Sequence, residues 1–155
     1  MPMRKLRDYL DRNRIDYSVV AHKKAYTAQE VAETSHIPGH EIAKTVIVKI
    51  DGTMAMAVLP ASEVIDLELL EEMTGAMMVE LADEGEFSVY FKDCETGAMP
   101  PFGNLFGMKV YVDPELALDK TIAFNAGNHT ELIRMKYLDF ERLVEPIMLE
   151  FGVMA

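Results

Sequence analysis

Residues 43–59 read AKTVIVKIDGTMAMAVL, and this stretch decides the fold. Two apolar segments flank Asp51-Gly52, a dipeptide that favours the left-handed backbone of a type I′ turn, so the stretch predicts a β-hairpin. Both faces of residues 45–50 are largely apolar. A strand that is apolar on both faces is usually covered on both sides, so we expect it at the centre of its sheet.

The segments before the hairpin predict a helix, a strand and a second helix. Residues 3–13 carry two leucines four positions apart, which suits a helix with one narrow buried stripe. Residues 16–21 predict a strand. Residues 27–30, Thr-Ala-Gln-Glu, match a capping box, in which hydroxyl and carboxylate satisfy free amides at a helix start. We expect this helix to reach about Thr34.

The segments after the hairpin predict further helices and short strands. Residues 65–74 predict a helix that stops at Gly75, with its acidic side chains, Asp66 among them, facing water. Short strands are expected over residues 108–112, 121–124 and 130–136, and Asp139 is a candidate N-cap of a last helix before Pro146. Strands joined partly by a hairpin and partly through helices imply a mixed α/β sheet. No linker or repeat interrupts the chain, which predicts a single domain over residues 1–155.

Composition narrows the classes of function. The net charge of −11 argues against non-specific nucleic-acid binding, and therefore against a DNA partner, although a local basic patch could still contact the end of an acceptor arm. Seven of the 15 basic residues lie in the first 24 positions, so we expect such a basic patch on the N-terminal face. No apolar run approaches a bilayer span and the N-terminus does not read as a secretory signal, so we expect a cytoplasmic protein without a membrane partner.

A loop rich in glycine and proline is the clearest candidate for a binding element. Residues 97–103 read GAMPPFG. Pro100 and Pro101 fix their own φ angles and lack an N–H, so they suit neither a central strand nor a helix interior. Gly97 and Gly103 leave the ends of the loop free to turn and let the backbone approach a ligand closely. The alternative is a rigid surface turn.

Three segments together resemble one family. The lysine that opens the central strand, AKTVIVKIDG at residues 43–52, is followed by the GAMPP loop and then by FNAGNHT at residues 124–130. In this order and at these separations they resemble the YbaK and prolyl-tRNA synthetase-associated domain family, the trans-editing aminoacyl-tRNA deacylases. The resemblance runs from about Tyr17 to Val144. It implies a curled mixed sheet, or pseudo-barrel, with flanking helices, and it favours a helix over residues 83–91, where the pattern alone fits helix and strand.

The resemblance also implies site residues. Lys44 corresponds to the functional lysine of the family, although a lysine at a strand end can simply extend into solvent. The loop Gly97, Ala98, Met99, Pro100 and Pro101 corresponds to the substrate loop, with Gly103 closing it. Asn125, Gly127 and His129 form the opposite wall, with His129 near the amino-acid pocket. A lone histidine can equally be structural.

The implied function is hydrolysis of the ester of a mischarged tRNA in trans. The histidine in the third segment resembles the one that the alanine editors of the family carry in this motif. The expected substrate is therefore a small residue such as alanine on proline tRNA. The partners are then the aminoacyl-tRNA acceptor end and prolyl-tRNA synthetase. The alternative is a non-catalytic module of the same fold that binds a tRNA end, a nucleotide or a synthetase.

Two other chemistries are set aside. Cys94, the only cysteine, and His129 could form a nucleophile and its base, but no third group that would orient them is evident. His36 and His40 have the spacing of a helical zinc pair, but Pro38 and Gly39 interrupt the helix that would align them. We therefore expect neither a metal site nor a cofactor.

Overall fold

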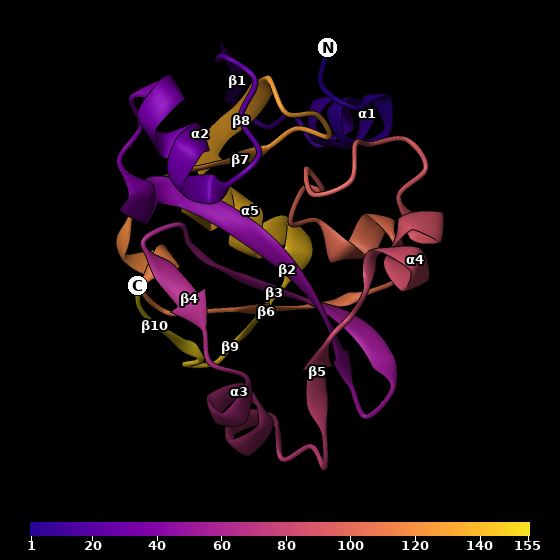
Figure 1. Cartoon of the computed structure of the whole chain (residues 1–155). Helices are drawn as coiled ribbons and strands as arrows, with labels where there is room; N and C mark the ends of the chain where they lie inside the picture. The colour runs from indigo at the N-terminus through magenta and orange to yellow at the C-terminus, as the bar shows by residue number, and fades with distance from the viewer.

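The computed structural model describes residues 1–155 and contains one large mixed sheet with helices around it (Figure 1). The sheet has eight strands in the order β1-β8-β7-β2-β3-β6-β9, with β5 pairing to β2 as a branch. A second, two-stranded sheet joins β10 to β4. The strands are β1 Tyr17–Ala21, β2 Ile42–Ile50, β3 Thr53–Pro60, β4 Glu63–Ile65, β5 Val79–Leu81, β6 Lys109–Val112, β7 Thr121–Asn125, β8 Glu131–Lys136, β9 Ile147–Met148 and β10 Gly152–Met154.

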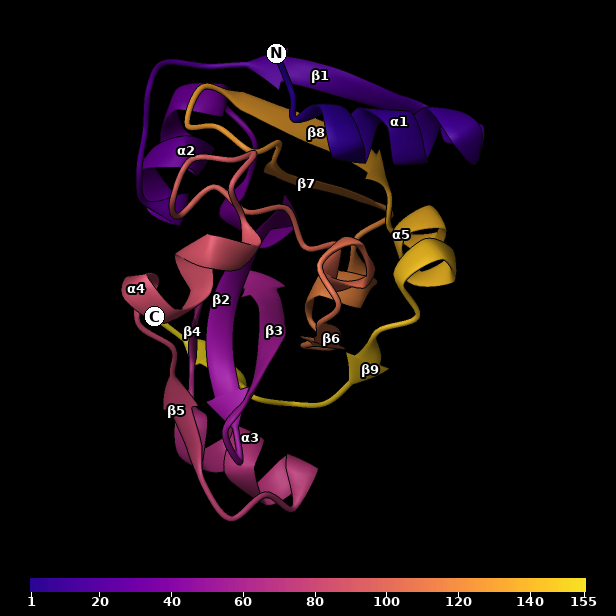
Figure 2. The same ribbon diagram turned by 90° about the vertical axis from the view of Figure 1, so that its right-hand side faces the viewer.

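Strand directions confirm the expected mixed α/β class. β2 pairs antiparallel with β3 and β5 but parallel with β7, and β3 pairs parallel with β6. Figure 2 shows that β2 and β3 run across the direction of β1, β8 and β7, so the sheet is strongly curled. Because β2 has β7 on one side and β3 on the other, the prediction of a central strand is confirmed.

The β2–β3 hairpin forms as its sequence predicts. Asp51 and Gly52 have φ angles of 48° and 84°, the left-handed values of a type I′ turn. The pairing runs without interruption from Ile50 opposite Thr53 to Ala43 opposite Pro60. α3 and β5 lie near the tip of this hairpin, at the end of the molecule far from α1 (Figure 1).

Five α-helices flank the sheet: α1 Arg4–Arg12, α2 Ala28–Ser35, α3 Leu67–Thr74, α4 Glu84–Phe87 and α5 Tyr137–Val144. α1 buries Leu6 and Leu10 completely, the predicted stripe. The capping box of α2 is confirmed, because Glu30 N donates to Thr27 Oγ1 and Thr27 N donates to Glu30 Oε1, both at 3.1 Å. None of the helices combines the length and the hydrophobicity that crossing a bilayer requires.

Two predicted helix starts are wrong. Ile65 belongs to β4, and α3 begins only at Leu67 because the Asp66 side chain accepts a hydrogen bond from Leu69 N at 3.0 Å. Asp66 is thus an N-cap rather than a purely solvent-facing side chain. Asp139 does not cap α5, which begins at Tyr137 and leaves Asp139 in the first turn. There a carboxylate still faces the positive end of the helix, without the cap hydrogen bond.

The segment 83–91 is helical, as the family resemblance favours. α4 occupies Glu84–Phe87 behind an Asp83 capping box, and a 3-10 turn follows at Ser88–Tyr90. β5, which precedes this segment and pairs with the hairpin end of β2, was not anticipated from the sequence.

The largest apolar cluster, of 23 buried residues, includes part of the glycine and proline loop. Phe102 is fully buried, and its ring centroid lies 5.4 Å from that of Phe124 on β7 and 5.6 Å from that of Phe140 on α5. This aromatic contact anchors the loop between α4 and β6 against the sheet. The loop is therefore held beside the start of β2.

Candidate active site

A pocket of about 160 Å³ opens at the start of β2, beside α2. It brings together side chains from four parts of the chain that are distant in sequence. Its lining residues are Tyr26, Ala28, Val31, Ile42, Ala43, Lys44, Thr45, Gly97 and Asn125. One residue from each of the three family-like segments, Lys44, Gly97 and Asn125, is among them.

Parallel pairing of β2 with β7 places Lys44 beside Asn125. Ile42 lies opposite Ala123 and Ala43 opposite Phe124, so the next positions along the two strands are Lys44 and Asn125. Neighbouring residues in register point to the same face of a sheet. The cation and the amide therefore share one wall of the pocket.

The Lys44 ammonium is held by a main-chain carbonyl. Its Nζ donates a hydrogen bond to the backbone oxygen of Glu63, at the start of β4. Burial lowers the pKa of Lys44, and the nearby Glu63 charge raises it by a smaller amount. An ammonium has three donors and this carbonyl uses one, so the others are available to a ligand in the pocket.

Gly97 reaches the pocket because its loop is bonded to the turn after β7. Glu95 N donates to Gly127 O at 2.7 Å, and Gly127 N donates to Ala98 O at 3.1 Å. Gly97 itself is exposed and has a φ of +88°, a conformation that other residues rarely adopt. Its N–H donates to Met99 Sδ at 3.2 Å, and the residue itself remains exposed while its neighbours are fixed.

His129 lies behind the pocket and does not line it. The side chain is 6% exposed, and its Nε2 lies 2.9 Å from Thr96 O. Its ring centroid is 4.7 Å from that of Tyr26, and a Cβ added to Gly97 would lie 3.6 Å from its Cε1. His129 therefore supports two lining residues, Tyr26 and Gly97, and can influence pocket shape through them.

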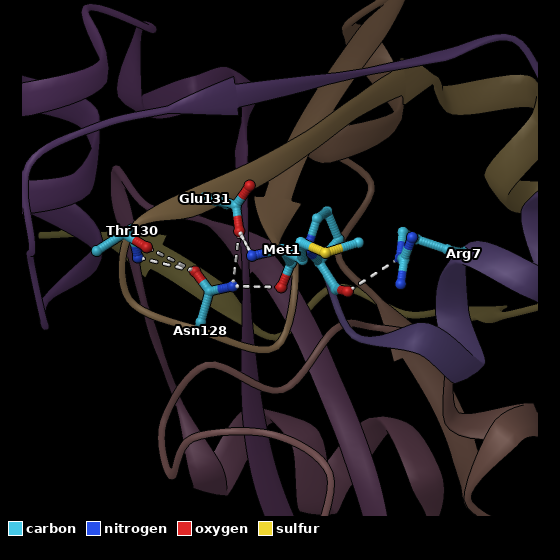
Figure 3. A network of polar contacts seen from close by, with 6 residues as sticks. Met1, Arg7, Asn128, Thr130 and Glu131 are labelled. Atoms are coloured by element: carbon cyan, nitrogen blue, oxygen red, sulfur yellow. Dashed lines mark hydrogen bonds and ion pairs between the residues drawn. The ribbon is translucent and has the colours of Figure 1, made fainter.

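Asn128 makes the turn between β7 and β8 rigid (Figure 3). Its amide nitrogen donates to Met1 O and to Glu131 Oε1, both at 3.0 Å, while its oxygen accepts from Thr130 N at 3.0 Å. The Met1 ammonium lies 2.7 Å from the same Glu131 carboxylate. This network holds the turn that carries His129.

The other candidate site residues lie outside the pocket lining. Ala98, Met99, Pro100, Pro101 and Gly103 are all buried, and Met99 packs in the main core. A Cβ on Gly103 would collide with Met108 O. The glycine is required there by close packing of the loop.

Gly127 is also a packing glycine. It has a φ of +97°, and an added Cβ would lie 2.8 Å from Met3 Cβ and 3.3 Å from Cys94 Cβ. The turn after β7 therefore packs directly against Met3, the residue before α1, and against Cys94, which follows α4.

Six lining residues were not anticipated from the sequence, and two of them, Tyr26 and Thr45, carry polar side chains. Thr45 Oγ1 and Asn125 Oδ1 are buried without a hydrogen-bond partner in the protein. Buried polar atoms are nearly always paired, so these two oxygens stand out among the polar groups of the lining residues. Their positions in the sequence could have indicated them, because Thr45 directly follows Lys44 and Tyr26 directly precedes the capping box of α2.

The pocket lining contains no histidine, cysteine or carboxylate. Cys94 is partly buried outside it, and burial raises the pKa of its thiol to about 11. A thiol with so high a pKa is a poor nucleophile near neutral pH. The arrangement can hold and polarise a substrate, but it lacks a side-chain nucleophile paired with a base.

Metal-ligating side chains do not gather in groups of three or more anywhere in the structure. α2 ends at Ser35, and His36 has a left-handed φ of 59°, so the expected break between His36 and His40 is present. His40 Nδ1 lies 2.9 Å from Asp119 Oδ1 instead.

Comparison with known proteins points to one family. The family model for the aminoacyl-tRNA editing domain matches residues 22–143. The multifunctional Ser/Thr-tRNA deacylase ProXp-y of Escherichia coli K12 is 30% identical over 142 residues, covering 88% of this chain and 84% of that protein. The prolyl-tRNA editing protein ProX of Acetoanaerobium sticklandii is 25% identical, covering 88% and 86%.

A solved structure shares the fold. A protein proposed to be a trans-editing enzyme for prolyl tRNA synthetase superposes with a TM-score of 0.83 at 17% identity, covering 97% of this chain and 96% of that one. The likeness extends over nearly the whole of both chains.

Proposed function

The chain belongs to the aminoacyl-tRNA editing domain family and is therefore a hydrolase of the aminoacyl-tRNA ester bond, and from this premise we propose that it releases a small amino acid from a mischarged tRNA in trans. The observation that carries the proposal is the pocket of about 160 Å³ where Lys44, Gly97 and Asn125 meet. Pockets for drug-sized ligands are about 300–1,000 Å³, so a pocket of this size suits one small aminoacyl group.

Hydrolysis in this pocket needs positioning rather than a protein nucleophile. An aminoacyl ester is activated, so water can attack its carbonyl carbon directly once the ester is held and its oxygen is stabilised. Lys44 supplies the positive charge, and the exposed backbone at Gly97 contacts the ester or the terminal ribose. The vicinal ribose hydroxyl then assists the proton transfer.

The surface around the pocket suits the acceptor end of tRNA. Tyr26 is 62% exposed, and the Lys24 ammonium lies 5.7 Å from the centroid of its ring. An exposed aromatic ring can stack on an unpaired base, and a neighbouring lysine can contact its phosphate. A small footprint of this kind is compatible with the net charge of −11. Prolyl-tRNA synthetase is the proposed protein partner.

Alanine on proline tRNA is the first candidate substrate. The third segment contains His129, and a histidine in this segment is typical of the alanine editors that it resembles. A synthetase pocket discriminates one methylene by only ~1–3 kcal/mol, so smaller amino acids are mischarged and a second, smaller site must remove them. This chain would be that second site.

Serine or threonine is the second candidate, and one observation favours it. Asn125 Oδ1, on the same wall as Lys44, has no partner in the protein and can accept a hydrogen bond from a substrate hydroxyl, which alanine lacks. The similar protein from Escherichia coli is a Ser/Thr-tRNA deacylase.

A deacylation panel tests both candidates. The purified chain is incubated with alanyl-, seryl-, threonyl-, cysteinyl- and prolyl-tRNA, with and without a chelator, and loss of the ester is followed. We expect release of a small amino acid without added metal. Rapid alanine release supports the first candidate and rapid serine or threonine release the second. Inactivity on every small amino acid, or complete loss with chelator, would contradict the mechanism.

A further inference from the structure

Two buried carboxyl groups lie together behind Lys44. Glu63, on β4, is 5% exposed, and Asp113, directly after β6, is 1% exposed. A Cβ added to Gly152 would collide with Glu63 Oε1 and lie 3.0 Å from Asp113 Oδ2, so both oxygens face the same side of that glycine. The two acids therefore form a pair in the protein interior.

The surroundings of the two acids differ. Asp113 Oδ2 accepts hydrogen bonds from Phe151 N at 3.1 Å and Gly152 N at 2.7 Å, and Oδ1 accepts from Glu115 N at 3.0 Å. Glu63 Oε1 is buried with no hydrogen-bond partner. Three backbone donors stabilise a carboxylate at Asp113, whereas an ionised Glu63 would place an unsolvated anion beside it.

A proton on Glu63 resolves this conflict. The protonated acid becomes a donor, and the Asp113 carboxylate is its acceptor. Burial raises the pKa of Glu63 to about 7, with further increases from the charges of Asp113 and Glu115, while Lys44 lowers it. These are the charged groups that act on Glu63 from the neighbouring elements.

The same residue holds Lys44. The backbone oxygen of Glu63 accepts the hydrogen bond from Lys44 Nζ, so a shift of Glu63 shifts the ammonium at the pocket. Glu63 also pairs with Met154 in the β4–β10 ladder, and Asp113 binds the residues that lead into β10. The acid pair thus ties β4, β6 and β10 together behind the pocket.

We propose that Glu63 is a positioning residue for Lys44, and that one proton shared between the Glu63 and Asp113 carboxyls keeps β4 and the Lys44 ammonium in place. Loss of this proton leaves two adjacent buried anions, which repel each other and loosen β4. The role in catalysis rests on the proposed function of Lys44, but the shared proton does not.

The sign of the pH effect follows from linkage. The folded protein keeps a proton on Glu63 that the unfolded chain releases near the ordinary pKa of glutamate. Stability from the pair is therefore fully present below that ordinary pKa and is lost as pH rises through about 7.

Thermal unfolding between pH 5 and pH 8 tests the pair without substrate. Glu63→Gln carries a permanent donor, so its melting temperature should fall less than that of the wild type between pH 5 and pH 8. The two falls should differ by roughly 5 °C for a protein of this size. Glu68→Gln, which removes an exposed charge that does not act on Glu63, should follow the wild type. Parallel curves for wild type and Glu63→Gln would overturn the proposal. If Glu63→Gln does not fold, Glu63→Ala removes the second anion while leaving the hydrogen bonds of Asp113 in place, and must flatten the curve instead.

Turnover then tests the positioning of Lys44. On the best substrate of the deacylation panel, the kcat ratio of Glu63→Gln to wild type should rise several-fold from pH 6 to pH 8, while Glu68→Gln gives a constant ratio. A constant ratio for Glu63→Gln would reduce the pair to a structural role. A melting difference without hydrolysis of any substrate would keep the acid pair and refute the proposed function instead.

Discussion

The two ends of β2 carry the same residue type in opposite environments. Near the hairpin turn, Lys49 Nζ lies 2.7 Å from Glu86 Oε2 and 3.3 Å from Glu80 Oε1. The hydrogen bond to Glu86 raises the pKa of Lys49 above the ordinary value. Lys44 Nζ, at the other end, donates to the backbone oxygen of Glu63 and has no carboxylate oxygen within ion-pair distance, and burial lowers the pKa of this lysine. One ammonium is satisfied by the protein and the other is left available to a ligand.

The glycines near the two ends show the same contrast. Gly52 in the hairpin turn and Gly97 at the pocket have φ values of +84° and +88°. A Cβ added to Gly52 meets nothing within 4 Å, whereas one on Gly97 would lie 3.6 Å from His129 Cε1. The hairpin end thus shows what local folding alone requires, whereas at the proposed site a second segment of the chain packs against the glycine.

Replacing Lys44 and Lys49 one at a time should give the largest difference in turnover between the two ends of β2. Lys44→Ala should lower turnover by about 100-fold, the scale of one lost electrostatic contact in a preorganised site, with the melting temperature nearly unchanged. Lys49→Ala is the matched control and should keep turnover while lowering stability slightly. Single-turnover deacylation and thermal unfolding of both variants measure this. Equal effects on turnover, or unfolding of Lys44→Ala, would assign Lys44 a structural role.

Replacing the two glycines should give the next largest difference. Gly97→Ala and Gly52→Ala each force a left-handed residue, which costs about 1 kcal/mol of stability in both variants. Only Gly97→Ala should also reduce kcat/KM, by about tenfold, because its backbone faces the pocket. Chemical denaturation and deacylation assays separate the two effects. Normal kcat/KM in a folded Gly97→Ala would remove the loop from the site.

His129→Ala should change specificity rather than the rate on every substrate. The ring supports Tyr26 and Gly97 from behind, so its loss should admit larger amino acids or weaken alanine release by several-fold. The shape of the pH profile should be retained. A general base would behave differently, with uniform slowing and loss of a titration step near the ordinary histidine pKa of ~6.5. Two substrates measured across pH distinguish these roles.

Cys94→Ala should have the smallest effect. The thiol lies outside the pocket lining, and burial raises its pKa to about 11, so water rather than sulfur should attack the ester. Most of the activity should remain. Trapping of an aminoacyl group on Cys94, followed by mass spectrometry of the quenched enzyme, would contradict this.

Local sequence signals determined the parts of the fold that depend on few neighbouring residues. The Asp51-Gly52 turn and the Thr27 capping box appear as expected, because φ preferences and cap hydrogen bonds act within three or four residues. The same locality explains the errors. Ile65 was assigned to a helix because its pairing partner, Gly152 on β10, lies 87 positions away in the chain (65 to 152) and leaves no mark on the local pattern.

Residue types and segment order were enough to indicate the family and to single out Lys44, Gly97 and Asn125. Only the tertiary structure decided that these three line one pocket, because it depends on parallel pairing between β2 and β7 and on bonds between the loop and the turn after β7. It also decided that Pro100, Pro101 and Gly103 are buried and that Glu63 meets Asp113 behind Lys44. Such contacts arise from the packing of distant segments, which the local sequence does not specify.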